Sequence, residues 1–341
     1  MNHAVVDLDD KGLLLAADGK TSVPGHRIPQ YLAGHLRVPT GATDLFLHVH
    51  GWQTTSEDAV VAATTLVRTA ITHRANHPDR YPHLGHGFRP WTVIVRWDSA
   101  GPFTPDGYER IKNRAHAMSR PPGHPDGTGY APQVIGHLLG YLDTHRGDPT
   151  ATRTQQTRDG QYLHLLGHSF GGRLLCEGLQ WASSTATHRT KATMGWSTPH
   201  DPARPFTVDS ALILQMAAPR DILTTHFPYL FPAPGRPGAP LRGPLVLTHS
   251  KSDHATGRWH RLAEGAPGIG HSGTSTAPVP QFNTHLHAVG EPYTAADLDH
   301  RLVNIDAGRY YRAKSIITGA HSDFHHPETA HLMLSLAEHS R

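Results

Sequence analysis

The sequence predicts an α/β protein, with a largely parallel β-sheet and helices packed on both of its faces. The first observation is an alternation along the 341 residues between short apolar runs and segments of helical periodicity. Strands that alternate with helices need crossover connections, which make neighbouring strands parallel and cover both faces of the sheet. The second observation is that one apolar run passes directly into a glycine-flanked serine, and a helical pattern follows at once.

The expected strands are short runs of apolar and β-branched residues, with the length typical of buried strands. Six are clear: residues 44–49, 91–97, 162–166, 210–216, 244–248 and 302–305. Two weaker candidates are residues 4–8 and 12–16. Helical periodicity falls between the strands, in residues 58–70, 108–119, 131–145, 172–182 and 327–339. We find no internal repeat, and we expect a single domain over residues 1–341.

Four stretches interrupt this alternation: residues 120–130, 146–160, 225–243 and 256–297. Long irregular stretches within a compact domain are often functional. The last two follow late strands, which places them over the carboxyl ends of the sheet, where open α/β folds bind ligands. We interpret residues 225–243 and 256–297 as insertions that form a partial lid or pocket wall, and the alternative is plain surface insertions.

Composition narrows the class of protein. The chain has 31 basic and 28 acidic side chains without a basic block, so nucleic acid is not an expected partner. Its one cysteine, Cys176, excludes an internal disulfide. Neither a secretory leader nor a membrane span is visible, so we expect a cytoplasmic protein. The 30 histidines predict a steep gain of positive charge below about pH 6.5.

The most informative motif is the pentapeptide from Gly167 to Gly171, with Ser169 at its centre. A strand precedes it and a helix follows it, which is the setting of a G-x-S-x-G nucleophile elbow. Such a turn holds the serine in strained backbone geometry and leaves no room for side chains at the flanking glycines. We therefore expect Ser169 to be a catalytic nucleophile at the positive end of the following helix.

An activated serine needs an orienting carboxylate and a base, which follow it in the order Ser, Asp or Glu, His on this type of sheet. Asp253 follows the strand at residues 244–248 and is the expected acid. Asp221, which follows the preceding strand, is the alternative. His321 lies in the loop before the last helix and is the expected base; neighbouring rivals are His325, His326 and His331. The spacing of these histidines lacks a clear partner set for a metal site.

The oxyanion hole needs two backbone N–H groups aimed at one point. The residue after the nucleophile, Phe170, should supply one of them. The second should come from the loop after an early strand, where Gly51 permits close approach and Trp52 offers its N–H. We expect His50, Gly51 and His168 to lie against the substrate.

Taken together, these pieces resemble the α/β-hydrolase superfamily, and within it a bacterial serine esterase and lipase-like branch. The resembling segments are residues 50–52, 96–101, 167–171, 217–219, 250–253 and 319–323. The resemblance implies an eight-stranded sheet with one antiparallel edge strand and a Ser-Asp-His triad. It implies no metal and no organic cofactor.

The expected activity is hydrolysis of a carboxylic ester or thioester through an acyl-serine, with a small-molecule acyl compound as the partner. Two alternatives stay open. The same acyl-serine could pass its acyl group to an alcohol or amine, as in an acyltransferase or a cyclising thioesterase. A hydrolase fold without activity could instead serve as a binding protein. Nothing in the sequence indicates an oligomeric state.

Overall fold

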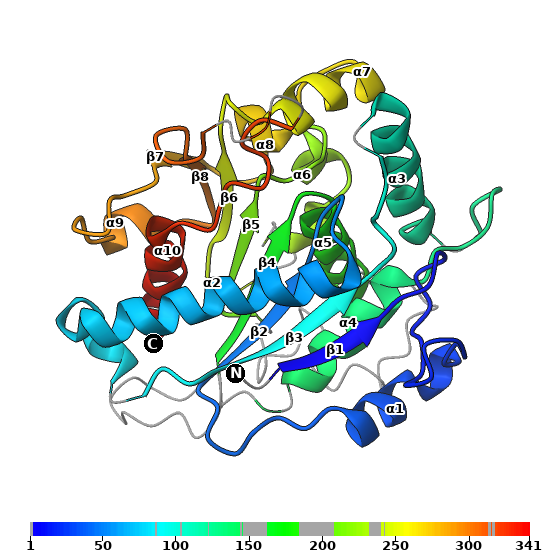
Figure 1. Ribbon diagram of the computed structural model, residues 1–341, viewed down its shortest axis with the longest axis horizontal. Helices are drawn as coiled ribbons and strands as arrows, with labels where there is room; N and C mark the ends of the chain where they lie inside the picture. The colour runs from blue at the N-terminus through cyan, green and yellow to red at the C-terminus, as the bar shows by residue number, and fades with distance from the viewer. Residues whose placement is uncertain are drawn as a thin grey trace.

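The computed structural model describes residues 3–341, apart from 86, 103, 122, 144, 146–161, 184–207, 232–239, 242, 313–314 and 316–317. Its centre is an eight-stranded sheet in the order β1-β3-β2-β4-β5-β6-β8-β7 (Figure 1). The strands are β1 (His3–Asp7), β2 (Asp44–Val49), β3 (Pro90–Arg96), β4 (Tyr162–His168), β5 (Ser210–Leu214), β6 (Leu245–His249), β7 (Gln281–His285) and β8 (Leu302–Asp306). The α/β class and the mainly parallel eight-stranded sheet are confirmed.

The expectation of an antiparallel edge strand is wrong, because all seven pairings among the described strands are parallel. The run at residues 12–16 does not join the sheet as a strand. The chain turns at Gly12, which has φ 82°, and then runs back past the end of β1. There it forms two isolated antiparallel bridges, Leu8 with Leu14 and Leu15 with Ser22. The chain then reaches the sheet again only at β2.

The described helices are α1 (Ile28–His35), α2 (Ser56–Asn76), α3 (Pro105–Met118), α4 (Ala131–Asp143), α5 (Phe170–Ser183), α6 (Ile222–Thr225), α7 (His260–Glu264), α8 (Ile269–Ser272), α9 (Ala295–Leu298) and α10 (Pro327–His339). They include all five segments in which the sequence shows helical periodicity. Local capping fixes where two of them begin: Thr55 accepts the N–H of Asp58 before α2, and Thr104 accepts that of Gly107 before α3.

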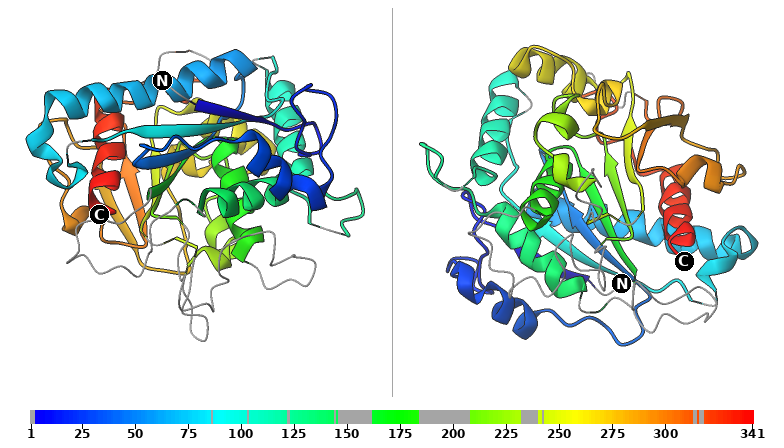
Figure 2. Two further views of the ribbon diagram at one scale, coloured as in Figure 1. Left: turned by 90° about the horizontal axis from the view of Figure 1, so that it is seen from below. Right: turned by 180° about the vertical axis from the view of Figure 1, so that it is seen from behind.

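Two apolar layers cover the sheet. Helices α2 and α10 pack on one face, and α1, α4 and α5 pack on the other (Figures 1 and 2). Strand β2 shows why the apolar runs are continuous. Leu45 and Leu47 belong to the core on the α4–α5 side, whereas Phe46 between them belongs to the core on the α2–α10 side. Side chains alternate between faces along a strand, so a central strand is buried at every position and is mostly apolar.

Residues 256–297 are more regular than the sequence suggests. They contain part of a π-helical turn (Ala255–Trp259), α7, α8, the edge strand β7 and the start of α9. Strand β7 pairs with β8 alone among the described strands and is half exposed, so its sequence, Gln-Phe-Asn-Thr-His, lacks the apolar run of a central strand. Of the stretch 225–243, residues 232–239 and 242 lie outside the described part of the chain.

The register brings the carboxyl ends of the central strands to one edge of the sheet. Val49 of β2 pairs with Gly167 of β4, and His168 pairs with Leu214 of β5. The turns that carry Trp52, Ser169 and Asp253 therefore leave the sheet side by side. Helices α3 and α7 lie next to each other at this end of the molecule (Figure 1).

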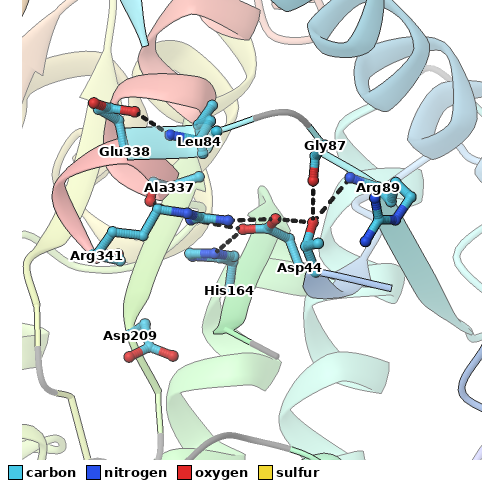
Figure 3. A network of polar contacts seen from close by, with 12 residues as sticks. Asp44, Leu84, Gly87, Arg89, His164, Asp209, Ala337, Glu338 and Arg341 are labelled. Atoms are coloured by element: carbon cyan, nitrogen blue, oxygen red, sulfur yellow. Dashed lines mark hydrogen bonds and ion pairs between the residues drawn. The ribbon is translucent and has the colours of Figure 1, made fainter. Parts of the chain in front are cut away.

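The opposite edge holds a buried polar network (Figure 3). Asp44, at the start of β2, accepts hydrogen bonds from both amino groups of Arg341, at 3.1 and 2.8 Å, and contacts His164 Nε2 at 3.1 Å. This network ties the last residue of the sequence to two central strands. Among the described helices, none offers a segment that is long and apolar enough to cross a membrane.

Candidate active site

Ser169 lies in the turn between β4 and α5 with φ 55°, a conformation that residues other than glycine rarely adopt. The flanking glycines are required by close approach. A Cβ atom at Gly171 would lie 2.2 Å from the carbonyl oxygen of Val49, and one at Gly167 would lie 2.5 Å from Cα of Gly172. The N–H of Ser169 also donates to the carbonyl of Leu214 at 3.0 Å. The turn is therefore held in its strained form by the strands on both sides.

The structure brings Ser169, His321 and Asp253 into one chain of hydrogen bonds. His321 Nε2 lies 2.8 Å from Ser169 Oγ, and His321 Nδ1 lies 2.9 Å from Asp253 Oδ2. All three residues are buried, with exposed fractions of 0, 2 and 0%. An ionised carboxylate only accepts, so Nδ1–H donates to Asp253 and Nε2 is left to accept the serine proton.

Asp253 is held by two further donors. The N–H of Thr256 donates to Oδ1 at 3.0 Å, and the side-chain amide of Gln215 donates to Oδ2 at 3.2 Å. Gln215 follows β5 with φ 47°, so it too adopts a conformation that is rare for residues other than glycine. The rival acid, Asp221, is exposed at the start of α6. The structure thus places Asp253, and not Asp221, against the histidine.

Gln215 is a residue that the sequence interpretation did not single out. A polar side chain at the end of an otherwise apolar run was the signal that could have found it. The other histidines near His321 have different contacts. His326 Nε2 contacts Asp323 at 2.9 Å, His331 hydrogen-bonds to Tyr81 on the far helix layer, and His325 is exposed.

His168 lies behind the base. Its Nε2 is 2.8 Å from the main-chain carbonyl oxygen of His321, and the two rings are 4.8 Å apart. Burial, and then the neighbouring charge of His321, lowers the pKa of His168 well below its usual value. The ring is therefore neutral, with Nε2–H donating. With 4% of its surface exposed, it contacts the main chain of His321 and offers little surface to a ligand.

His50 is likewise engaged by the protein itself. Its Nδ1 lies 3.0 Å from the carbonyl oxygen of Gly51, and its Nε2 accepts the N–H of Trp97 at 3.2 Å. Burial lowers the pKa of His50 to about 4, so it is neutral at pH 7. Gly51 packs so closely on the elbow that a Cβ atom there would lie 2.5 Å from Cβ of Ser169. This contact brings the loop that carries Trp52 against the serine.

Aromatic side chains from three elements surround this turn. Tyr108 of α3 packs against Trp52 at 5.2 Å and against Phe170 at 5.3 Å, and Trp259 lies 6.2 Å from Trp52. The hydroxyl of Tyr108 is buried without a hydrogen-bond partner among the described residues. Burial, reinforced by the nearby carboxylate of Asp253, raises the pKa of Tyr108 well above its usual value. A neutral phenol therefore faces the buried centre.

An ion pair joins α3 to α7, the two helices that lie next to each other at this end of the molecule. Lys112 Nζ of α3 lies 3.4 Å from Glu264 Oε1 of α7 and donates to the carbonyl of Ala263 at 3.2 Å. The Lys112 side chain is only 10% exposed and that of Glu264 26% exposed. Because Ser169 below them has no exposed surface, this conformation is closed to a substrate.

No family model matches this sequence, and no curated protein matches it. Among solved structures, TT1662 from Thermus thermophilus is similar at 14% identity, over 89% of this chain and 91% of that chain, with a TM-score of 0.37. The propionate-bound esterase Est2 from Thermogutta terrifontis is similar at 10% identity, over 80% and 74%, with a TM-score of 0.29. Esterase PE8 is similar at 13% identity, over 71% and 88%, with a TM-score of 0.26. The order of the strands and the serine turn, rather than these distant likenesses, give the chain an α/β-hydrolase-like fold.

Proposed function

We propose that this protein is a serine hydrolase that cleaves a carboxylic ester or thioester through an acyl-serine intermediate. The observation that carries the proposal is the continuous contact from Ser169 Oγ through the His321 ring to Asp253, at 2.8 and 2.9 Å. These distances are within hydrogen-bond reach of a nucleophile and its base. The three residue types, in these roles and this chain order, are those of acyl transfer on such a sheet.

In the proposed reaction, Ser169 Oγ attacks the acyl carbon while His321 Nε2 takes its proton. Asp253 keeps the Nδ1–H tautomer in place and stabilises the imidazolium that forms. The imidazolium then gives the proton to the departing alcohol or thiol, which leaves the acyl group on Ser169. Water, deprotonated by the same histidine, attacks the acyl-serine and releases a carboxylic acid and the free enzyme.

The proposed oxyanion hole uses the backbone N–H groups of Phe170 and Trp52. Phe170 is the first residue of α5, where an N–H has no partner within the helix and lies at the positive end of the helix dipole. The tight contact of Gly51 with Ser169 supports Trp52 as the source of the second donor. Loss of one such donor typically raises the barrier by about 2.7–4 kcal/mol.

The buried serine implies that substrate reaches it only after the helices above it move. We propose that α3 and the segment 256–297 form the wall of an acyl pocket, with the Lys112–Glu264 pair as the tie between them. The apolar rings of Tyr108, Trp259 and Trp52 suit an acyl chain, and they would exclude bulk water from the closed site.

A fluorophosphonate probe followed by peptide mass spectrometry tests the proposal. We expect covalent labelling at Ser169, no labelling of Ser169→Ala, and hydrolysis of p-nitrophenyl esters that is lost in the same variant. Product analysis with an added alcohol or amine separates hydrolysis from acyl transfer. If the probe does not label folded wild-type protein, or labels Ser169→Ala equally, the result would contradict the hydrolase proposal and favour a binding protein.

A further inference from the structure

We propose that His285, His287 and Glu291 form a binding site for a divalent transition metal, with zinc as the best-suited ion, at the edge of the sheet beside β7. One ring nitrogen of each histidine and one carboxylate oxygen of Glu291 all lie within 4.8 Å of one another. This site is separate from the proposed catalytic centre, since β8 lies between β7 and the strand that leads to Asp253.

The strand geometry explains why the two histidines meet. His285 ends β7, and the extended chain continues through Leu286, whose N–H donates to Asp306 at 2.9 Å. Residues two apart on an extended chain share a face, so Leu286 is buried in the core while both imidazoles point the other way. Their ring centroids are 4.9 Å apart. A turn, closed by the Glu291 N–H donating to Ala288 at 2.9 Å, brings the carboxylate back to them.

His287 carries a second, independent observation. Its residue is 5% exposed, and its Nδ1 atom is buried without a hydrogen-bond partner among the described residues. Buried polar atoms are nearly always satisfied, and an orphan calls for a missing ligand or ion. His285 and Glu291 are the exposed partners: their side chains are 59% and 48% exposed, and His285 Nε2 and Glu291 Oε2 lie 3.8 Å apart.

Neighbouring side chains hold the main chain of His287 and Glu291 and one face of the His287 ring. The Tyr293 ring stacks on the His287 ring at 4.1 Å with an interplanar angle of 3°, and its hydroxyl accepts the main-chain N–H of His287 at 3.0 Å. His331 Nε2 donates to the carbonyl of Glu291 at 2.9 Å. Its other nitrogen is held by the hydroxyl of Tyr81, which fixes this tautomer.

The charges also suit a cation. Glu291 supplies one carboxylate to the set. The nearby cation, Arg80, donates to the main-chain carbonyl of Val289. Two imidazoles and one carboxylate leave a fourth tetrahedral position for water, which is a ligand set that zinc accepts.

A bound ion would join the end of the edge strand to the turn before α9 and, through His331, to α10. We therefore infer a structural role: the ion stabilises the folded protein by mass action and fixes an edge that pairs with one strand only in the described sheet.

The test uses the full-length protein stripped of metal with a chelator and titrated with ZnCl₂ by isothermal titration calorimetry. We expect one tight equivalent in the wild type, above the weak background of the other histidines, and a rise in melting temperature on binding. His285→Ala and Glu291→Gln, both at exposed positions that leave the core intact, should each weaken the tight equivalent at least tenfold. His300→Ala is the matched control. His300 stacks on Phe282 of β7 at 4.2 Å, so it lies near the site, but it is outside the ligand set.

Two outcomes of the titration distinguish a specific metal site from background binding by other histidines. A tight equivalent that is lost in His285→Ala and Glu291→Gln but kept in His300→Ala supports the site. Binding that is equal in all four proteins, or that is weak and unsaturated in the wild type, would overturn it. Ser169→Ala should bind zinc like the wild type, so failure of the proposed hydrolase activity leaves this proposal standing.

Discussion

The side chain of His168 hydrogen-bonds to the main-chain carbonyl of His321 at 2.8 Å, so the residue directly before the elbow serine holds the backbone of the proposed base. The two residues are 153 positions apart in the sequence. One short turn thus positions both partners of the proton transfer: Ser169 through its own backbone and His321 through the neighbouring imidazole. Because the His168 ring is buried and neutral, this contact does not change as pH varies around 7.

His168→Ala should lower kcat roughly tenfold, the upper end of what one buried hydrogen bond contributes. KM should change little, because the contact orients the base and not the substrate. His168→Gln, whose amide can reach the same carbonyl, should recover part of the loss. Steady-state kinetics on a p-nitrophenyl ester would show the split. An equal loss in both variants, with KM rising, would instead place His168 against the substrate.

Asp253→Asn should lower kcat by several orders of magnitude, on the order of 10⁴-fold, because the amide favours the wrong tautomer of the base. Asp221→Asn is the control, since Asp221 is exposed at the start of α6 and should retain full activity. Burst and steady-state rates of both variants settle the assignment. The reverse pattern, an active Asp253→Asn and an inactive Asp221→Asn, would transfer the acid role to Asp221.

The Lys112–Glu264 pair should control access to the serine. Glu264→Gln removes the ion pair and should speed fluorophosphonate labelling of Ser169 roughly two- to fivefold, in line with the energy of a partly exposed ion pair. High salt should narrow the difference between the two proteins. Glu109→Gln is the control, because Glu109 is an exposed acidic residue of α3, the helix that carries Lys112. Labelling rates that match the wild type would mean that the closed state is held by other contacts.

Arg341→Ala should destabilise the protein by about 3–5 kcal/mol, because it removes one partner of a buried ion pair. Asp44 is fully buried, and the loss of Arg341 leaves its charge with two weaker side-chain partners, His164 at 3.1 Å and the hydroxyl of Thr43, which donates at 2.7 Å. Urea unfolding measures the change. Catalytic rates at saturating substrate should stay near the wild-type value, since this network lies at the other edge of the sheet. A loss of activity without a loss of stability would contradict this division.

Stability should fall as pH drops from about 6.5 towards 4. Burial lowers the pKa of His48 to about 3 and that of His50 to about 4, so the unfolded chain takes up protons in this range that the folded chain cannot. More protons bound to the unfolded state means that stability rises with pH through the window and levels off above it, by roughly 1.4 kcal/mol per pH unit for each such histidine. Urea midpoints between pH 4.5 and 8 would show the slope. His48→Gln should reduce it, and a flat profile would be evidence against buried neutral histidines.

Much of the site was predictable because its signals are local. The strand, turn and helix around Ser169 adjoin one another in the sequence, and Asp253 and His321 each follow a clear apolar run. The contacts of His168 and Gln215 were not predictable, because each depends on a partner that another strand brings near. Strand β7 was not predicted for a different reason, because a half-exposed edge strand has no continuous apolar run. Without a predicted strand at this position, nothing in the sequence indicated that His285 and His287 lie side by side.

The absence of exposed surface at Ser169 has a consequence for how the protein would behave at rest. A buried hydroxyl reacts with an acyl compound only while the helices that cover it are apart. The turnover rate would then depend on how often these helices open and not on the chemical reactivity of the ester bond. A ligand able to hold the helices apart would gain a kinetic preference before any chemistry takes place.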